Sequence, residues 1–331
     1  MRYDVITIGG VVEDISFHTN EGIIIDNKKD MLRQRLLAFE YGAKIKIDKV
    51  DKTFGGGAAN AAVSFSRLGL STACVASIGT DERGKRILNN FKKEKVATEF
   101  IHKSKLFETA YSFILVGPSN EHIVFSNRGA NQDLKIANTK NLENTKWIFI
   151  SSLSGNWQKD LADLFKVKNV KIAWNPGHRQ LIGGIKVLNH YLAKTYVLLV
   201  NKDEALEICL SSGKLKGKNN ASVNDTENLL KILKSFGPRI VVITEGAKGA
   251  KCFDGQKIYS QKAIKKKVFN TTGVGDAFGS SFVAGLELYK GDIIESLKLA
   301  ALNSASVVTH LGAQTGLIKM KVSAKGGSAS G

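Results

Sequence analysis

The chain has 331 residues, 43% hydrophobic and 24% charged, which fits a soluble globular protein with one large or two modest domains. Its net charge of +18 comes from lysines that are dispersed, and no nucleic-acid-binding motif accompanies them, so we expect no nucleic acid partner. No apolar run reaches bilayer length and the N-terminus lacks the pattern of a signal peptide, so we expect a cytoplasmic protein that does not bind membranes.

Apolar stretches typical of buried strands alternate along the chain with segments of helical periodicity. We expect strands at 1–10, 72–78, 147–151, 170–175, 196–201 and 240–244. We expect helices at 55–69, 81–94, 158–165, 204–209, 226–235, 277–289 and 293–311, and hairpins at 110–127 and 250–260. This order predicts an α/β fold with a mostly parallel sheet covered by helices on both faces.

The segment 11–50 does not follow this alternation: it reads as irregular, with one possible strand at 21–26. We expect it to join the hairpin at 110–127 in a small β appendage over one end of the sheet. No linker divides residues 1–320, which we take as one domain, and the Gly/Ser-rich end at 321–331 is expected to be a flexible tail. The three cysteines, Cys74, Cys209 and Cys252, fit no metal spacing, and their apolar surroundings predict core packing.

The most informative segment is 270–278, NTTGVGDAF, a glycine-bearing turn that leads directly into a helical pattern. The backbone N–H groups of Gly273, Val274 and Gly275, at the positive end of a helix dipole, form an anion site. Asp276 can accept the proton of an attacking hydroxyl, and the dipole is expected to keep it ionised. A proton acceptor inside an anion site predicts a small-molecule kinase with Asp276 as the catalytic base.

Two further segments follow predicted strands, where ligands gather in α/β sheets. Asp14 could accept hydrogen bonds from paired hydroxyls, or it could be a turn residue. Gly55 and Gly56 would let a ligand approach the backbone and Asn60 would contact a sugar hydroxyl, or the segment is simply a tight turn at a helix start.

A third segment lies between the strand at 196–201 and the helix that follows it. Asn201 and Glu204 are three residues apart and offer the oxygen ligands that Mg²⁺ prefers, largely through water. The same pair could equally form a helix-capping box.

Taken together, these motifs resemble the ribokinase-like (PfkB) family of carbohydrate and nucleoside kinases. The similar motifs lie in the family's order: GGGAAN at 55–60, NKDE at 201–204, GAKG at 246–249, TTGVGD at 271–276 and the helix ending in GAQ at 300–314. The resemblance implies a doubly wound ribokinase-like fold with a β-sheet lid, formed by parts of 11–54 and 110–128. It also implies transfer of the γ-phosphoryl group of ATP, and homodimers through the lid occur in the family.

The resemblance assigns roles by position. Asp276 is the base in an anion hole of Gly273, Val274 and Gly275, and Asn201 with Glu204 organises Mg²⁺. Asp14, Gly55, Gly56 and Asn60 hold the substrate, whereas Thr244, Gly246, Gly249 and Asn303 lie near the nucleotide. The family's usual aspartate is replaced by Asn270, which leaves activation by K⁺ open.

The acceptor is expected to be a small-molecule sugar, with a nucleoside as the alternative within the same fold. A sugar phosphate or sugar acid would call for a basic residue near the pocket, and Arg128 is the candidate. A non-catalytic sugar-binding regulator is a further alternative, which the presence of Asp276, Asn201 and Glu204 argues against.

Overall fold

A computed structural model describes residues 3–26, 35–117, 122–136 and 139–320, so the expected tail at 321–331 lies outside the described residues. Its central sheet has nine strands in the order β15-β14-β13-β12-β11-β10-β1-β6-β7. Seven of them are parallel: β1 (Tyr3–Ile8), β6 (Thr72–Gly79), β7 (Ile101–Ser104), β10 (Thr145–Ile150), β11 (Lys171–Trp174), β12 (Val197–Asn201) and β13 (Ile240–Thr244). The antiparallel strands β14 (Ala250–Phe253) and β15 (Ile258–Gln261) complete one edge.

The sheet is doubly wound, as the sequence predicts. The chain runs outward from β1 through β6 to β7, and then returns to β10 on the other side of β1 and continues to β13. The winding direction therefore reverses between β1 and β10, and the carboxyl ends of the strands at such a switch point form a crevice suited to ligands.

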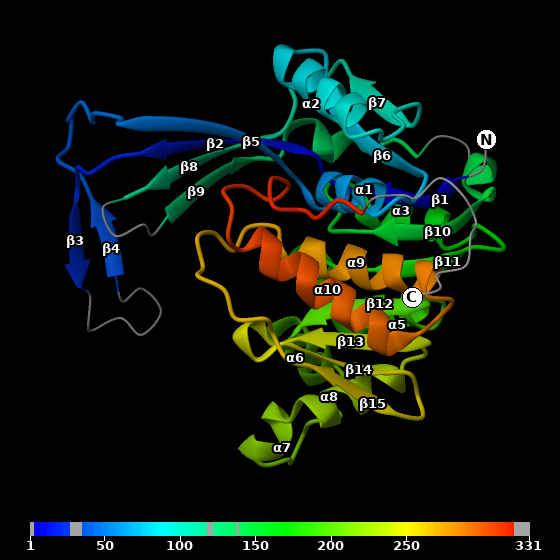
Figure 1. The fold of residues 1–331 in the computed structure, drawn as a ribbon. Helices are drawn as coiled ribbons and strands as arrows, with labels where there is room; N and C mark the ends of the chain where they lie inside the picture. The colour runs from blue at the N-terminus through cyan, green and yellow to red at the C-terminus, as the bar shows by residue number, and fades with distance from the viewer. Residues whose placement is uncertain (1–2, 27–34, 118–121, 137–138, 321–331) are drawn as a thin grey trace, which may run out of the picture.

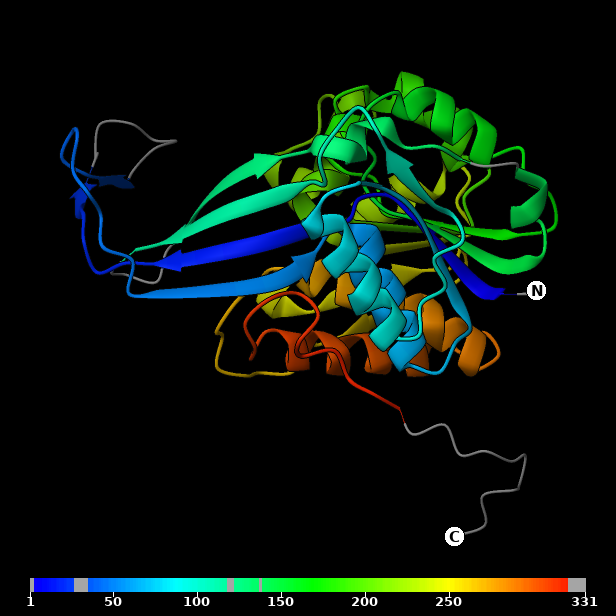
Figure 2. The same cartoon turned by 90° about the horizontal axis from the view of Figure 1, so that it is seen from above.

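Helices cover both faces of the sheet (Figures 1 and 2). One face packs against α1 (Gly57–Arg67), α2 (Glu82–Lys93), α9 (Val274–Leu288) and α10 (Ile293–Val307). The other face packs against α3 (Trp157–Leu164), α5 (Gly184–Leu192), α6 (Lys202–Ser211) and α8 (Thr226–Lys234), with the short helices α4 (His178–Leu181) and α7 (Asn220–Asn224) nearby. Helices α4 and α5 were not expected, because they are short and α5 buries only Leu188 and Leu192 along its length.

The interior contains the three cysteines as buried free thiols, which confirms their expected role in core packing. Burial raises the pKa of the Cys74 and Cys209 thiols to about 12. In the part of the chain that the structure describes, no helix is both long and apolar enough to cross a membrane.

A second sheet, which we call the lid, projects from one end of the central sheet (Figure 1). It consists of β5 (Lys49–Gly55), β2 (Val12–His18), β8 (Tyr111–Val116) and β9 (His122–Asn127), and the hairpin of β3 (Ile23–Asp26) and β4 (Arg35–Ala38) lies at its far end. Strand β2 corrects the expectation of irregular structure from residue 11 onward. Its acidic residues hide the strand pattern, because Glu13 is 1% exposed and its carboxylate is paired with Arg86 at 2.6 and 2.8 Å.

Arg67, the last residue of α1, ties three segments together. Its guanidinium donates to both carboxylate oxygens of Glu94 at 2.8 Å, and the pKa of Glu94 is lowered by this hydrogen-bonded partner. The Arg67 Nη1 also donates to the carbonyl oxygens of Gln314 at 2.7 Å and Leu317 at 2.9 Å. The turn that follows α10 is therefore held against α1 and the end of α2.

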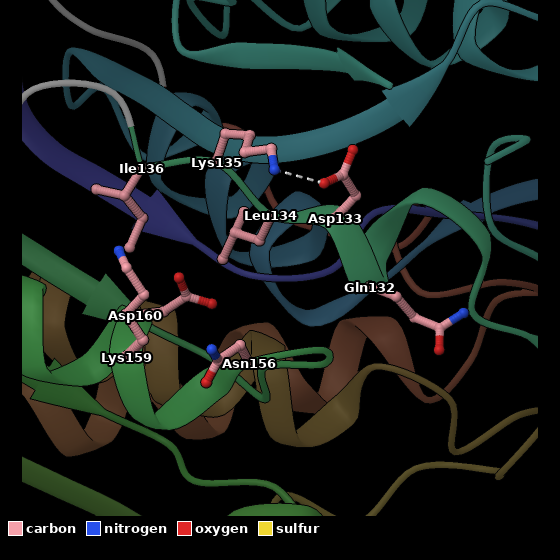
Figure 3. A pocket seen from close by; sticks show the side chains of 8 residues that line it. All are labelled: Gln132, Asp133, Leu134, Lys135, Ile136, Asn156, Lys159 and Asp160. Carbon is pink, nitrogen blue, oxygen red and sulfur yellow. Dashed lines mark ion pairs between the residues drawn. The ribbon is translucent and has the colours of Figure 1, made fainter. Parts of the chain in front are cut away.

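A cavity of about 300 Å³ lies beside the N-terminal part of α3 (Figure 3). Figure 3 shows the eight side chains that line it, with the Asp160 carboxylate turned toward the space between them. Asp160 is 8% exposed, and its carboxylate has no hydrogen bond to any of the described residues. The neighbouring lysines are engaged elsewhere, Lys135 with Asp133 and Lys159 with Asp163, both at 2.8 Å. Burial raises the pKa of Asp160 from 3.8 to about 6.

Replacing Asp160 with Asn is expected to stabilise the fold at pH 7.5 by on the order of 1 kcal/mol. The folded chain prefers the protonated carboxyl, so the stabilising contribution of Asp160 is fully present below pH 3.8 and is lost as the pH rises through about 6. The advantage of the neutral amide should therefore disappear below about pH 4. Urea unfolding of both proteins at pH 4, 5, 6 and 7.5 measures this difference in the free energy of unfolding.

The control is Asp163→Asn on the same helix. Its carboxylate is paired with Lys159 and Lys166, which lower its pKa, so this variant should not gain stability at neutral pH. A D160N protein no more stable than wild type at pH 7.5 would contradict the prediction.

Candidate active site

A hollow of about 180 Å³ opens at the carboxyl ends of β12 and β13 and reaches the start of α9. It is lined by Asn175, Leu199, Val200, Asn201, Glu204, Thr244, Gly273, Gly275, Asp276, Phe278 and Gly279. A second hollow of about 250 Å³ adjoins it through Asn201 and Thr244 and is lined as well by Lys202, Asp203, Glu245, Gly246 and Lys248. The structure thus brings together residues that lie in four separate segments of the sequence.

The turn before α9 is shaped by its glycines. Gly273 caps the helix with φ 76°, and a Cβ at this position would overlap Ala313, so only glycine fits without displacing the turn. Gly275 is the opposite case: a Cβ there would meet no atom within 4 Å. The N-terminal end of α9 therefore borders open space at Gly275, as an anion site requires.

One of the three expected anion-binding N–H groups already has a partner. The Val274 N–H donates to the Thr271 carbonyl oxygen at 3.3 Å. Within the described residues, no hydrogen bond is found for the N–H groups of Gly273 and Gly275. The Asn270 side chain also shapes this turn, because its Oδ1 accepts the Thr272 N–H at 2.6 Å.

Asp276 is half-buried at the start of α9. Its Oδ2 accepts a hydrogen bond from Nδ2 of Asn60 at 2.8 Å, and a Cβ on Gly57 would lie 3.3 Å from its Oδ1. Burial raises the pKa of Asp276 and the Asn60 hydrogen bond opposes that rise. The carboxylate is consequently a stronger base than an exposed aspartate, and burial opposes the effect expected of the helix dipole, which is to keep it ionised.

The residues expected on the substrate side lie where the lid joins the body. Asp14, on β2, is 7% exposed and pairs in register with Thr53 of β5 and Ser112 of β8. Burial raises its pKa, and a hydrogen bond to Ser112 opposes the rise. A Cβ on Gly55 would overlap the Asp14 carboxylate, so a larger residue here would have to displace that side chain. Gly56 caps α1, which carries Asn60.

Asn201 and Glu204 form a capping box at the start of α6, which confirms the structural alternative. The Glu204 N–H donates to Asn201 Oδ1 at 2.9 Å, and the Asn201 N–H donates to Glu204 Oε2 at 2.8 Å. Both residues also line the hollow beside Asp276, and burial raises the pKa of Glu204. No group of three or more His, Cys, Asp or Glu side chains suited to a metal occurs among the described residues.

The remaining predicted residues are placed differently. Thr244 and Gly246 line the second hollow, and the Gly249 carbonyl closes the turn beside it by accepting the Glu245 N–H at 2.7 Å. Arg128 is exposed at the junction of β9 with the body, where it donates to Ser154 Oγ at 3.0 Å.

Asn303, which is expected to lie near the nucleotide, belongs to the core in this structure. Asn303 is fully buried, and its amide donates to the hydroxyls of Ser281 at 2.7 Å and Ser64 at 3.2 Å. Its Oδ1 accepts the Ile318 N–H at 2.9 Å. Its side-chain polar atoms therefore hold together α1, α9, α10 and the segment that follows α10.

Two polar residues near the site were missed. Asn175 follows β11 and lines the hollow, with its Nδ2 donating to the Leu199 carbonyl oxygen at 2.8 Å. Its position just after a buried strand was the available signal. Gln314 contacts Asn60 at 3.1 Å, and no local pattern pointed to that contact.

Comparison with known proteins places this geometry in context. Residues 24–320 match the family described as pfkB family carbohydrate kinase. The chain is 27% identical over 324 residues to an ATP-dependent 6-phosphofructokinase of Thermoanaerobacterium thermosaccharolyticum, covering 90% of this chain and 94% of that protein. It is 25% identical to a ribokinase of Staphylococcus aureus, covering 83% of this chain and 89% of the relative.

Solved structures show the same fold. Arabidopsis thaliana ribokinase, solved with ribose and ATP, superposes with a TM-score of 0.78 at 18% identity, covering 96% of each chain. A Methanocaldococcus jannaschii nucleoside kinase gives a TM-score of 0.75 at 22% identity, covering 96% of this chain and 95% of that one.

Proposed function

Because the chain belongs to the pfkB family of carbohydrate kinases, we propose that it transfers the γ-phosphoryl group of ATP to a hydroxyl of a sugar, with Asp276 as the base. One observation carries this proposal: a half-buried carboxylate, with its pKa raised by burial, stands in the first turn of α9 beside the open space at Gly275. A proton acceptor and an anion-binding helix end are thereby placed together.

The carboxylate and the helix end have different roles in the proposed reaction. Asp276 accepts the proton of the attacking hydroxyl, and its raised pKa makes that transfer more favourable than it would be to an exposed aspartate. The N–H groups of Gly273 and Gly275 donate to the oxygens of the phosphoryl group as it moves. Phosphoryl transfer depends mainly on such positioning and charge stabilisation.

Asn201 and Glu204 fit a Mg²⁺ ion that keeps most of its waters. Their oxygens line the hollow, and the absence of a three-ligand protein cluster in the described residues suits an ion held chiefly by phosphates and water. When bound, the ion supplies positive charge to the phosphates. The adjoining hollow at Thr244 and Gly246 is the proposed nucleotide side.

The acceptor side is the junction between lid and body. Asp14 offers a buried carboxylate to paired hydroxyls, which favours a polyol such as a free sugar. Arg128 at the same junction would favour a sugar phosphate, and the chain's similarity to a 6-phosphofructokinase adds that acceptor to the candidates. A nucleoside is the third class.

Turnover of Mg·ATP, measured by ADP release, separates these acceptors and tests the base. Asp276→Asn should lower turnover by about 10³-fold or more and leave ATP binding intact, because the amide cannot accept the proton. The panel is ribose, fructose, 2-keto-3-deoxygluconate, fructose 6-phosphate, ribose phosphates, adenosine, guanosine and cytidine.

Asp163→Asn, a surface carboxylate variant on α3, is the control and should turn over normally. Near-normal turnover by D276N would remove Asp276 as the base. A wild-type protein that binds ATP and phosphorylates no acceptor would favour the regulator alternative.

Gly275→Ala tests the anion site with a variant that is expected to fold normally. The added methyl meets no atom within 4 Å, and alanine stabilises a helix by about 0.5–1 kcal/mol relative to glycine, so the melting temperature should hold or rise. Turnover should nevertheless fall at least about 10-fold, because the methyl occupies the space where a phosphoryl oxygen would approach the helix end. Normal turnover in a stable G275A protein would argue against an anion site here.

We further propose that two copies associate through the lid. The lid exposes large apolar side chains, including Val50 at 49%, Val124 at 50% and Phe125 at 57% exposure. Light scattering should give a dimer for the wild type and a monomer for Phe125→Glu. Ile182→Glu, at a 67% exposed position on the body, is the matched control and should remain dimeric. A monomeric wild type would contradict the proposal.

A further inference from the structure

Three side-chain amides form a continuous hydrogen-bonded row that ends on Asp276. Asn90 Nδ2, on α2, donates to Gln314 Oε1 at 3.0 Å. Gln314 Nε2, in the turn after α10, donates to Asn60 Oδ1 at 3.1 Å. Asn60 Nδ2, on α1, donates to Asp276 Oδ2 at 2.8 Å. Every amide in the row therefore points its N–H toward the carboxylate.

The direction of this row follows from the chemistry of its last member. An ionised carboxylate can only accept hydrogen bonds, so Asn60 must present its NH₂ group to Asp276. Its carbonyl oxygen then faces Gln314, which must answer with a donor. The Gln314 carbonyl oxygen faces Asn90 in turn, which again must answer with a donor. Reversing any one amide would place two donors or two acceptors against each other.

Burial makes such a reversal costly. Asn60 is 4% exposed and Gln314 is 7% exposed, so water has little access to satisfy a misdirected amide. An unsatisfied buried donor or acceptor costs about 1–3 kcal/mol. The row consequently holds Asn60 in one orientation, although the Asn60 amide by itself could rotate to the other.

The backbone of Gln314 is anchored separately from its side chain. Arg67 Nη1 donates to the Gln314 carbonyl oxygen at 2.7 Å, while the same guanidinium is paired with Glu94. A change confined to the Gln314 side chain therefore leaves this backbone anchor in place. The role of the Gln314 side-chain amide can therefore be tested while the turn after α10 stays in place.

We propose that Gln314 is a positioning residue that orients Asn60 so that its NH₂ group, and not its carbonyl oxygen, faces the catalytic base, an inference that rests on the proposed function of Asp276. Gln314 does not contact the reacting atoms in this assignment. It acts through Asn60. In this assignment Asn60 donates a hydrogen bond to the base, in addition to its expected contact with the substrate.

Two further charged groups lie on elements near the base in the described part of the chain. Glu204 of α6 lines the same hollow, and Asp14 of β2 lies beyond Gly55. Both are acidic, and no cationic side chain bonds to Asp276 among the described residues. The Asn60 NH₂ group is therefore the contact that favours the ionised form, as the direction of its effect on the pKa of Asp276 indicates.

Gln314→Glu tests the direction of the row. An ionised carboxylate in place of this amide accepts from both Asn90 and Asn60, so the Asn60 amide turns and presents its carbonyl oxygen to Asp276. Asp276 must then be protonated to make a hydrogen bond with Asn60, which raises its pKa. The added negative charge of the glutamate raises that pKa further. The acidic limb of the kcat–pH profile should move upward by about one pH unit or more.

Gln314→Met removes the donor without adding charge and should lower kcat more than it raises the KM for the acceptor. Gln158→Glu, an exposed position on α3, adds the same charge away from the row and should leave the profile unchanged. Melting temperature and ATP binding show that each variant is folded. An NMR titration of the Asp276 carboxyl carbon gives the same pKa comparison without requiring turnover.

An upward shift in Q314E alone, in both the rate profile and the NMR titration, supports the positioning role. A folded, active Q314E protein with an unchanged acidic limb and an unchanged Asp276 titration overturns it, even if stability has fallen. Failure of the proposed function looks different. In that case D276N remains active or the wild type has no kinase turnover, while the NMR titration still reports whether Gln314 controls Asp276.

Discussion

The Asp276 carboxylate is half-buried at the first turn of α9, where burial raises its pKa and one amide hydrogen bond from Asn60 lowers it. The residues around Asp276 must therefore both bury the carboxylate and supply it with a hydrogen-bond donor. Space must remain at the helix end, which the bare Gly275 provides, and the amide must point its donor inward. A base at this position can then be stronger than an exposed aspartate and still be ionised when it is needed.

The lid and the base are joined by very little chain. Strand β5 ends at Gly55, which packs against the Asp14 carboxylate, and α1, which carries Asn60, begins at Gly57. Only Gly56 separates the strand from the helix. The proposed acceptor side at Asp14 and the proposed base at Asp276 are therefore linked through one short segment of chain, Gly55 to Asn60.

Asn201 and Glu204 combine a structural role with a proposed functional one. The capping box uses Asn201 Oδ1 and Glu204 Oε2 to satisfy backbone N–H groups at the start of α6. That arrangement also holds both side chains at the wall of the hollow, where Glu204 Oε1 is the carboxylate oxygen that the capping box does not use. The capping box is thus a feature of the structure, and the role of the pair toward Mg²⁺ stays a proposal.

The sequence by itself determined the alternation of strands and helices and the positions of the glycine turns, because periodicity and turn chemistry act over a few residues. Strand β13 has the bounds that its apolar pattern predicts, and β14 begins at the residue where the predicted hairpin begins. Strand β2 escaped prediction because its acidic residues are buried by partners from elsewhere, Glu13 by Arg86. Only the tertiary structure placed Asn303 in the core and engaged the Val274 N–H within its turn. It alone brought Gln314 to Asn60, 254 positions away in the chain. Such contacts depend on how helices pack across the sheet, and no local pattern of residues encodes them.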